Sequence, residues 1–369
     1  MRMRNHSFLQ MCKCLALLPF LLSSGCVMDK GVGILVYDLA DNHAVSFVPQ
    51  NYPERQSCLL IQRGAKGDTF FTFDKGSDGK SFISERGING DIVSKWETTI
   101  PEPYYPMQTM ALSPNLEKVA FLIRPERATT YKSSHLAPVP GVRITMLDGT
   151  LLKTLDERPK GLIGLNKRIH WLSDETIITS SHLWENRSDQ IIRYDLKADK
   201  ETTKDYFFAR SITSALVLPS PDNQHVLLLR KSDNHVDILD PWTMTLVGEV
   251  QIAPEPKGIK SIDAAWLDSN EFLAWDSYSS QIIQYNISTR QSKLVKPEFP
   301  SKKYKICTFV GNHFILRRDG DCSMWSYNVK TGKLSKISRY AVGCVYPLND
   351  NIILLDRAIH PQNPWNIIN

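Results

Sequence analysis

Short runs in which apolar and polar residues alternate recur along the chain, and most are bounded by Gly, Pro, Asn, Asp or Ser. Alternation with a period of two residues is typical of β-strands that bury one face. These runs come in groups of four. The pattern therefore predicts an all-β chain built from repeated four-stranded units.

A short signature marks the same position in six of these groups. It consists of Tyr or Leu, then Asp or Asn, and usually an apolar residue: Tyr37-Asp38-Leu39, Leu147-Asp148-Gly149, Tyr194-Asp195-Leu196, Leu239-Asp240-Pro241, Tyr285-Asn286-Ile287 and Tyr327-Asn328-Val329. From Asp148 to Asn328 the signature recurs at intervals of 47, 45, 46 and 42 residues. Because Asp and Asn accept a hydrogen bond from the backbone two residues on, the signature predicts a hairpin turn. The interval fits a four-stranded propeller blade.

The strand pattern predicts six complete blades and two half-blades. The complete blades are expected over residues 58–96, 107–155, 169–205, 214–250, 262–295 and 304–337. The first half-blade is expected within residues 33–48 and the second within residues 344–355. Pairing the two halves would complete a seventh blade and remove the exposed sheet edges.

The predicted fold is therefore a seven-bladed β-propeller of four-stranded antiparallel blades, closed by pairing the N- and C-terminal strands in one blade. A ring of six or eight blades is the nearest alternative. A pair of β-sandwiches or a β-helix is disfavoured, because the strands come in fours at an irregular period above 40 residues.

The first 26 residues have the pattern of an export signal. Arg2, Arg4 and Lys13 precede an apolar run that ends at Leu22, and Ser23-Ser24-Gly25-Cys26 follows. A charged segment, a short apolar run and small residues before a cleavage site are typical of secretion, and this run is too short to span a bilayer.

This segment resembles a bacterial lipoprotein signal, although Ser23 stands where that family usually has Leu. The resemblance implies that residues 1–25 are removed and that Cys26 is acylated. Val27 follows the cysteine in place of an aspartate, which in this family implies the outer membrane, with the protein facing the periplasm. The alternative is an ordinary secretory signal with a chance cysteine, which would leave the mature protein soluble.

Composition limits the remaining function classes. The whole chain has a net charge of +5, and loss of residues 1–25 with their three positive charges leaves about +2 on 344 residues. This weak charge argues against nucleic acid as a partner. No run of 18 apolar residues follows Cys26, so membrane attachment is expected through the lipid alone. The expected organisation is a signal peptide at 1–25, a propeller at 26–357 and a C-terminal tail at 358–369.

The mature chain keeps four cysteines besides Cys26, namely Cys58, Cys307, Cys322 and Cys344. In an oxidising compartment they could form disulfides in three pairings. None has the Cys-x-x-Cys spacing of a zinc site. Structural disulfides and buried small side chains are the two interpretations, and no metal or cofactor is predicted.

Two turns carry a further resemblance. Leu112-Ser113-Pro114-Asn115 and Pro219-Ser220-Pro221-Asp222-Asn223 each precede an apolar strand. They resemble the Ser-Pro-Asp-Gly turn of TolB-type and WD-like β-propellers, whereas the Gly-His and Trp-Asp signatures of true WD repeats are absent. The resemblance implies a propeller body. Outer-membrane propeller lipoproteins of the barrel-assembly type are similar in organisation and imply a scaffolding role.

Catalytic motifs are mostly absent from the sequence. It has no Gly-x-Ser-x-Gly elbow and no His-x-x-x-His or His-Glu-x-x-His pair. Propeller lactonases hold calcium in the central channel with ligands from several blades, and such a site leaves no local motif. A hydrolase of this type is therefore the alternative function.

Aromatic and arginine side chains gather in the segments expected to connect strands on one face of the ring. These candidate partner-binding residues are Tyr104, Tyr105, Arg127, Tyr131, His182, Trp184 and Arg187. Such side chains are frequent hot spots of protein interfaces. The alternative is that Tyr104, Tyr105 and Trp184 only cover the ends of the sheets. The sequence thus predicts a lipid-anchored propeller that binds or scaffolds an envelope or secreted protein.

Overall fold

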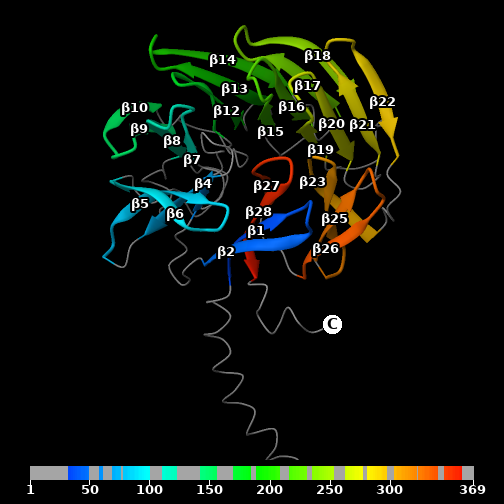
Figure 1. Ribbon diagram of the computed structural model, residues 1–369. Coiled ribbons are helices and arrows are strands. Elements are labelled where there is room, and N and C mark those ends of the chain that lie inside the picture. The colour runs from blue at the N-terminus through cyan, green and yellow to red at the C-terminus, as the bar shows by residue number, and fades with distance from the viewer. Residues whose placement is uncertain are drawn as a thin grey trace, which may run out of the picture.

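In the part of the chain that the structure describes, twenty-eight strands form seven four-stranded antiparallel sheets arranged as a ring (Figure 1). The computed structural model describes residues 32–49, 58–60, 69–75, 78–99, 110–122, 142–155, 169–183, 188–207, 216–230, 235–252, 262–276, 281–296, 303–321, 323–339 and 345–359. The predicted seven-bladed propeller is confirmed. Within the described ranges there is no helix that could cross a bilayer.

The blades are numbered here in chain order. Blade 1 contains β3 (Cys58–Leu60), β4 (Thr69–Lys75), β5 (Ser81–Gly87) and β6 (Ile92–Thr98). Blade 2 contains β7 (Met110–Leu112), β8 (Lys118–Leu122), β9 (Val142–Met146) and β10 (Leu151–Leu155). Blade 3 contains β11 (His170–Ser173), β12 (Thr176–Leu183), β13 (Ser188–Asp195) and β14 (Lys200–Phe207).

The other half of the ring follows the same order. Blade 4 contains β15 (Leu216–Pro219), β16 (Val226–Arg230), β17 (His235–Asp240) and β18 (Thr245–Gln251). Blade 5 contains β19 (Ile262–Trp266), β20 (Glu271–Asp276), β21 (Ile282–Asn286) and β22 (Gln291–Val295). Blade 6 contains β23 (Tyr304–Val310), β24 (His313–Arg318), β25 (Met324–Asn328) and β26 (Leu334–Ser338).

Blade 7 closes the ring with strands from both ends of the chain. It joins β27 (Val345–Pro347) and β28 (Ile352–Ile359) to β1 (Val32–Asp38) and β2 (His43–Pro49), in the order β2-β1-β28-β27. The antiparallel pair β1 and β28 runs from Val32 opposite Ile359 to Asp38 opposite Ile352. This is the predicted closure, and β28 continues two residues past the boundary expected at 357.

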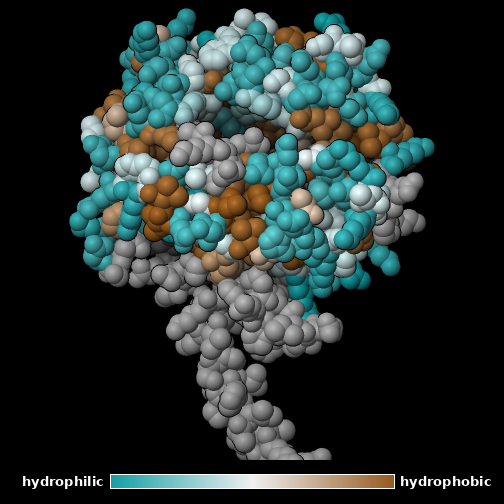
Figure 2. Space-filling view, in the orientation of Figure 1, coloured by the Kyte–Doolittle hydropathy of each residue, from teal (hydrophilic) through white to brown (hydrophobic). Residues whose placement is uncertain are grey.

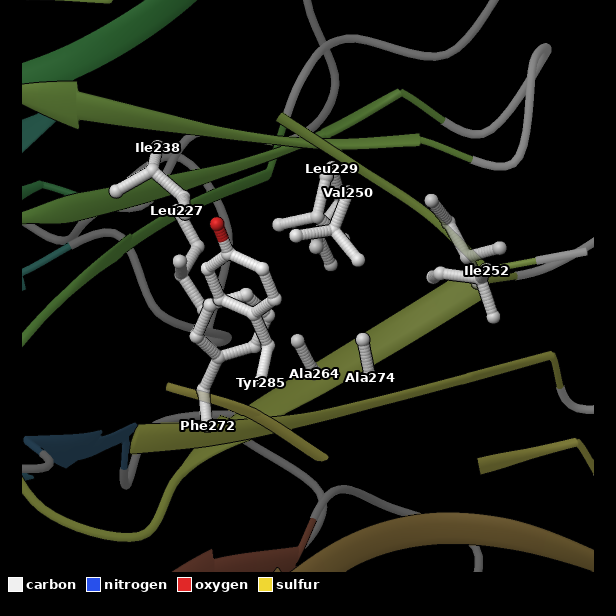
Figure 3. Close-up of a cluster of buried hydrophobic side chains, with 11 residues drawn as sticks. Leu227, Leu229, Ile238, Val250, Ile252, Ala264, Phe272, Ala274 and Tyr285 are labelled. Carbon is white, nitrogen blue, oxygen red and sulfur yellow. The ribbon is translucent and has the colours of Figure 1, made fainter. Parts of the chain in front are cut away.

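The hydrophobic core lies between the blades. The described residues form seven buried clusters, and each joins two neighbouring blades. Figure 3 shows the cluster between blades 4 and 5, where Leu227 and Ile238 meet Phe272 and Tyr285. Alternating strand residues supply both sides of each sheet with apolar side chains, so the period-2 pattern of the sequence builds two interfaces per blade.

Tryptophans in first strands add hydrogen bonds between blades. The indole N–H of Trp171 in β11 donates to the carbonyl of Ala111 in β7 at 2.9 Å. The indole N–H of Trp266 in β19 donates to the carbonyl of Leu218 in β15 at 3.0 Å. Both bonds join first strands of adjacent blades, so these tryptophans pack between blades.

The surface mixes hydrophilic and hydrophobic areas, with brown patches separated by teal in Figure 2. Several exposed apolar side chains lie on the fourth strands, among them Ile92, Val93, Leu151, Leu152, Leu246 and Val247. In every one of these strands the exposed pair lies at or beside the first residue of the strand. Single exposed residues of this kind are ordinary on soluble proteins.

Candidate functional site

The two faces of the ring differ in the connections that they carry. Connections between first and second strands, and between third and fourth strands, lie on one face, here called the turn face. Connections between second and third strands, and from one blade to the next, lie on the opposite face, here called the loop face. The four connections longer than eight residues all belong to the loop face: 99–109, 123–141, 156–169 and 252–261.

Hairpin turns on the turn face are held by the predicted Asp and Asn residues. The carboxylate Oδ1 of Asp240 accepts hydrogen bonds from the backbone N–H groups of Trp242 at 2.8 Å and Thr243 at 3.2 Å. Equivalent backbone bonds are made to Asp38, Asp148, Asp195, Asn286 and Asn328. The bond from the backbone N–H of Thr150 also holds the pKa of Asp148 below its ordinary value. The six-fold signature is therefore a turn motif.

The two Ser-Pro turns share one hydrogen-bond pattern. The Ser113 hydroxyl donates to Oδ1 of Asn115 at 2.7 Å, and the Ser220 hydroxyl donates to Oδ1 of Asp222 at the same distance. Each serine oxygen also accepts the backbone N–H five residues on, that of Lys118 or His225. These turns have the geometry that the propeller resemblance implies, and they too lie on the turn face.

The loop face carries the segments in which partner-binding residues were predicted. The connections 99–109 and 123–141, which contain Tyr104, Tyr105, Arg127 and Tyr131, flank blade 2 on this face. Trp184 and Arg187 belong to the connection between β12 and β13. All six residues lie outside the described ranges, so their assignment stays a prediction.

His182 was expected in that same connection, and this placement was wrong. It lies in β12 and pairs with Asp189 of β13. The β12–β13 ladder continues without a break from Thr176 opposite Asp195 to Leu183 opposite Ser188. Backbone pairing in a long hairpin extended the two strands past the polar residues at which the sequence pattern placed their ends.

The cysteine predictions fall mostly outside the described residues. Cys26, Cys322 and Cys344 lie outside them, and only the backbone of Cys58, in β3, is described. Cys307 lies half-buried in β23, with its sulfur 3.9 Å from the carbonyl oxygen of Lys305. Acylation at Cys26 and disulfide pairing remain predictions.

A channel metal site would need ligands from several first strands. Among the described residues of these strands, Asp263 of β19 is the one carboxylate. Its Oδ1 accepts the backbone N–H of Ala264 at 3.0 Å. No group of three His, Cys, Asp or Glu side chains suited to a metal occurs within the described ranges.

Sequence reasoning missed a basic cluster at the loop-face end of blade 6. It consists of Lys296, Lys303, Lys305, Arg317, Arg318, Lys336 and Arg339, and is here called the blade 6 basic cluster. These residues come from two connections and three strands spread over 44 residues, so they form no run in the sequence. The Arg317-Arg318 pair at the end of a predicted strand was its one local signal.

Known proteins resemble this chain in structure only. No family model matches the sequence, and no curated protein matches it. The periplasmic gluconolactonase PpgL of Pseudomonas aeruginosa superposes with a TM-score of 0.51 at 11% identity, over 88% of this chain and 99% of that chain. A protein of unknown function from Desulfotomaculum acetoxidans gives 0.51 at 11% identity, over 89% and 99%.

The likeness is one of fold. The propeller domain of Cps50 (Swd1) from Myceliophteria thermophila gives a TM-score of 0.49 at 12% identity, over 79% of this chain and 89% of that chain. Proteins this different in sequence share a ring architecture that serves many functions.

Protonation of His313 is expected to make stability depend on pH. Its side chain is 7% exposed at the start of β24, and burial lowers the pKa below the ordinary 6.5. Its Nε2 lies 2.9 Å from the amide nitrogen of Asn328, whose Oδ1 accepts the backbone N–H groups of Lys330 and Thr331. Nε2 must therefore accept a hydrogen bond from the Asn328 amide N–H. Protonation of Nε2 would place two hydrogen-bond donors against each other.

Because the unfolded chain binds this proton near pH 6.5 and the folded protein does so only at lower pH, stability is complete above pH 6.5 and falls below it. Between about pH 7 and about pH 5, we expect the free energy of unfolding to fall less in His313→Gln than in the unchanged protein. The difference is expected to reach up to about 1.4 kcal/mol per pH unit. Denaturant unfolding across this range measures it. Parallel curves for the two proteins would contradict the prediction.

Proposed function

We propose that this chain is a lipid-anchored propeller that faces the periplasm and binds an envelope or secreted protein. The concentration of its long connections on one face carries the proposal. Three of the four longest connections adjoin blade 2, and two of them hold the predicted aromatic and arginine residues. Rigid blades can present such segments at low entropic cost, which favours recognition.

The short connections of the turn face also favour the loop face as the binding surface. Its described connections contain two to six residues, and hydrogen bonds from Asp, Asn and Ser side chains hold many of them. Short turns of this kind close hairpins and leave few residues for specific contacts. A partner with an extended interface therefore fits the loop face better.

The test is photo-crosslinking in cells that make the full chain. A photoreactive phenylalanine analogue at Tyr131 is expected to trap a discrete protein, whereas the same analogue at Thr331 on the turn face is expected to trap none. With the analogue kept at position 131, the trapped protein should be lost from a Tyr104→Ala, Trp184→Ala variant and kept in the control Trp242→Ala, which changes an exposed aromatic side chain on the turn face.

Two results would contradict the proposal. Loss of the crosslink in Trp242→Ala but not in the Tyr104→Ala, Trp184→Ala variant would place the interface on the turn face. If position 131 traps no protein and the purified chain hydrolyses lactones only with a divalent metal, the propeller hydrolase becomes the better account.

A further inference from the structure

Both ends of the described chain leave blade 7 at the loop face. Val32, where β1 begins, lies opposite Ile359, where β28 ends. In Figure 1 these two central strands, blue and red, lie next to the orange strands of blade 6. A buried cluster of apolar residues joins blades 6 and 7. The N-terminal connection therefore starts beside the loop-face end of blade 6.

The distance from the ring to a lipid on Cys26 is limited by covalent geometry. Five residues separate Cys26 from Val32, so six Cα–Cα steps join them. A fully extended chain covers at most about 3.6 Å per residue, so this segment reaches roughly 20 Å. If Cys26 is acylated, the loop-face end of blade 7 cannot lie far from the bilayer surface.

Charge is divided unequally between the two faces. From residue 26 onward, the connections on the loop face, together with both terminal segments, contain 19 Lys and Arg residues and 13 Asp and Glu residues. The connections on the turn face contain 6 basic and 11 acidic residues. By sequence alone, the loop-face connections and terminal segments thus carry a net charge of +6, and the turn-face connections carry −5.

The blade 6 basic cluster lies among the described residues at the loop face. Lys305 of β23 and Arg317 of β24 are directly opposite each other across the ladder. Like charges in this arrangement are unfavourable unless an anion lies near them. Arg317 is exposed, so an external anion has access to it.

Neighbouring carboxylates neutralise only part of the cluster. Asp319 lies 3.5 Å from Lys305, and Asp321 lies 3.5 Å from Arg318. The exposed side chains of Lys296, Lys303 and Arg317 have no carboxylate within ion-pair distance in the described part of the chain. Within the described ranges, three exposed cations at this end of the ring thus have no carboxylate partner.

We propose that the loop-face rim of blades 6 and 7 lies against an anionic lipid surface, with the blade 6 basic cluster in contact with the headgroups. The inference rests on the anchor at Cys26 in the proposed function. The short segment from Cys26 to Val32 and the positive charge of the blade 6 basic cluster would both hold this rim near an anionic bilayer. The acidic turn face then points away from the bilayer, and a partner on the long connections of blade 2 must bind close to the membrane.

Footprinting of the acylated full mature protein on vesicles tests the orientation. Lysine acetylation is compared on phosphatidylcholine vesicles with and without phosphatidylglycerol. We expect Lys303 to be modified at least about 5-fold more slowly on the anionic vesicles, as contact with a charged surface implies. Lys330, on the turn face of the same blade, should be unaffected. At about 1 M salt, where the Debye length is about 3 Å, the protection should disappear.

A pair of charge-reversal variants provides the control. Lys303→Glu with Arg317→Glu is expected to abolish protection at Lys296, whereas Lys330→Glu with Lys333→Glu, on the turn face of blade 6, should leave it intact. Both pairs change four charge units in the same blade. Circular dichroism shows whether each variant remains folded.

Mass spectrometry of the N-terminal peptide separates the two ways of failing. Acylated protein with equal modification of Lys303 on both kinds of vesicle would overturn the proposed orientation and leave the anchor standing. A Cys26 that carries no acyl chain would overturn the anchor, and the orientation with it.

Discussion

Replacement of Gly311 by Ala is expected to lower the free energy of unfolding by about 3 kcal/mol. Gly311 forms the turn between β23 and β24 with φ of +55°, in the left-handed region that non-glycine residues avoid. An added Cβ would also clash with the carbonyl oxygen of Asp350, and would lie 3.1 Å from its carbonyl carbon. Asp350 belongs to blade 7, so the clash would push blade 6 away from the closing blade.

Gly332→Ala is the matched control for this prediction. Gly332 lies in the β25–β26 turn of the same blade with φ of +68°, and no atom lies within 4 Å of its added Cβ. This variant is expected to lower the free energy of unfolding by only about 1 kcal/mol, the cost of holding a non-glycine residue in the left-handed conformation. Denaturant unfolding of both variants measures the difference, and equal losses would mean that the contact between blades 6 and 7 relaxes at no cost.

Trp275→Ala is expected to lower the free energy of unfolding by about 3–5 kcal/mol. Trp275, in β20, is 0% exposed and belongs to the cluster between blades 5 and 6, where it is grouped with Phe314 and Leu316. Alanine would leave a cavity the size of most of an indole. Close-packed blades cannot collapse into such a space without breaking their strand ladders.

A conservative variant separates volume from hydrogen bonding at this site. The indole nitrogen of Trp275 is buried without a hydrogen-bond partner. Trp275→Phe removes this unsatisfied group, so we expect it to cost less than about 1.5 kcal/mol. Thermal or denaturant unfolding of the three proteins measures both losses. A phenylalanine variant as unstable as the alanine variant would contradict this account.

Local chemistry explains why the blades could be found in the sequence. At Asp240 and Asn328 the turn is made by a side chain and the backbone two or three residues away. Nothing distant in the chain is needed for such a bond, so the six signatures correctly marked six hairpins. The period-2 pattern then placed the strands on either side to within a few residues.

Long-range pairing set the features that the pattern misjudged. His182 is polar and was predicted to lie in a connection, yet the register of β12 with β13 keeps it in the ladder opposite Asp189. The blade 6 basic cluster was missed for a related reason. Lys305 and Arg317 are 12 residues apart, and only the β23–β24 register places them opposite each other.

The sequence by itself determined the blade count and the closure of the ring, because repeats, turns and apolar periodicity are local properties. Only the tertiary structure decided the register of each ladder, where the two ends of the described chain leave the ring and which charged side chains meet. Those properties depend on the pairing of β1 with β28 and on the order of strands in every blade. Residues far apart in the chain come together only through that pairing, and no local pattern records it.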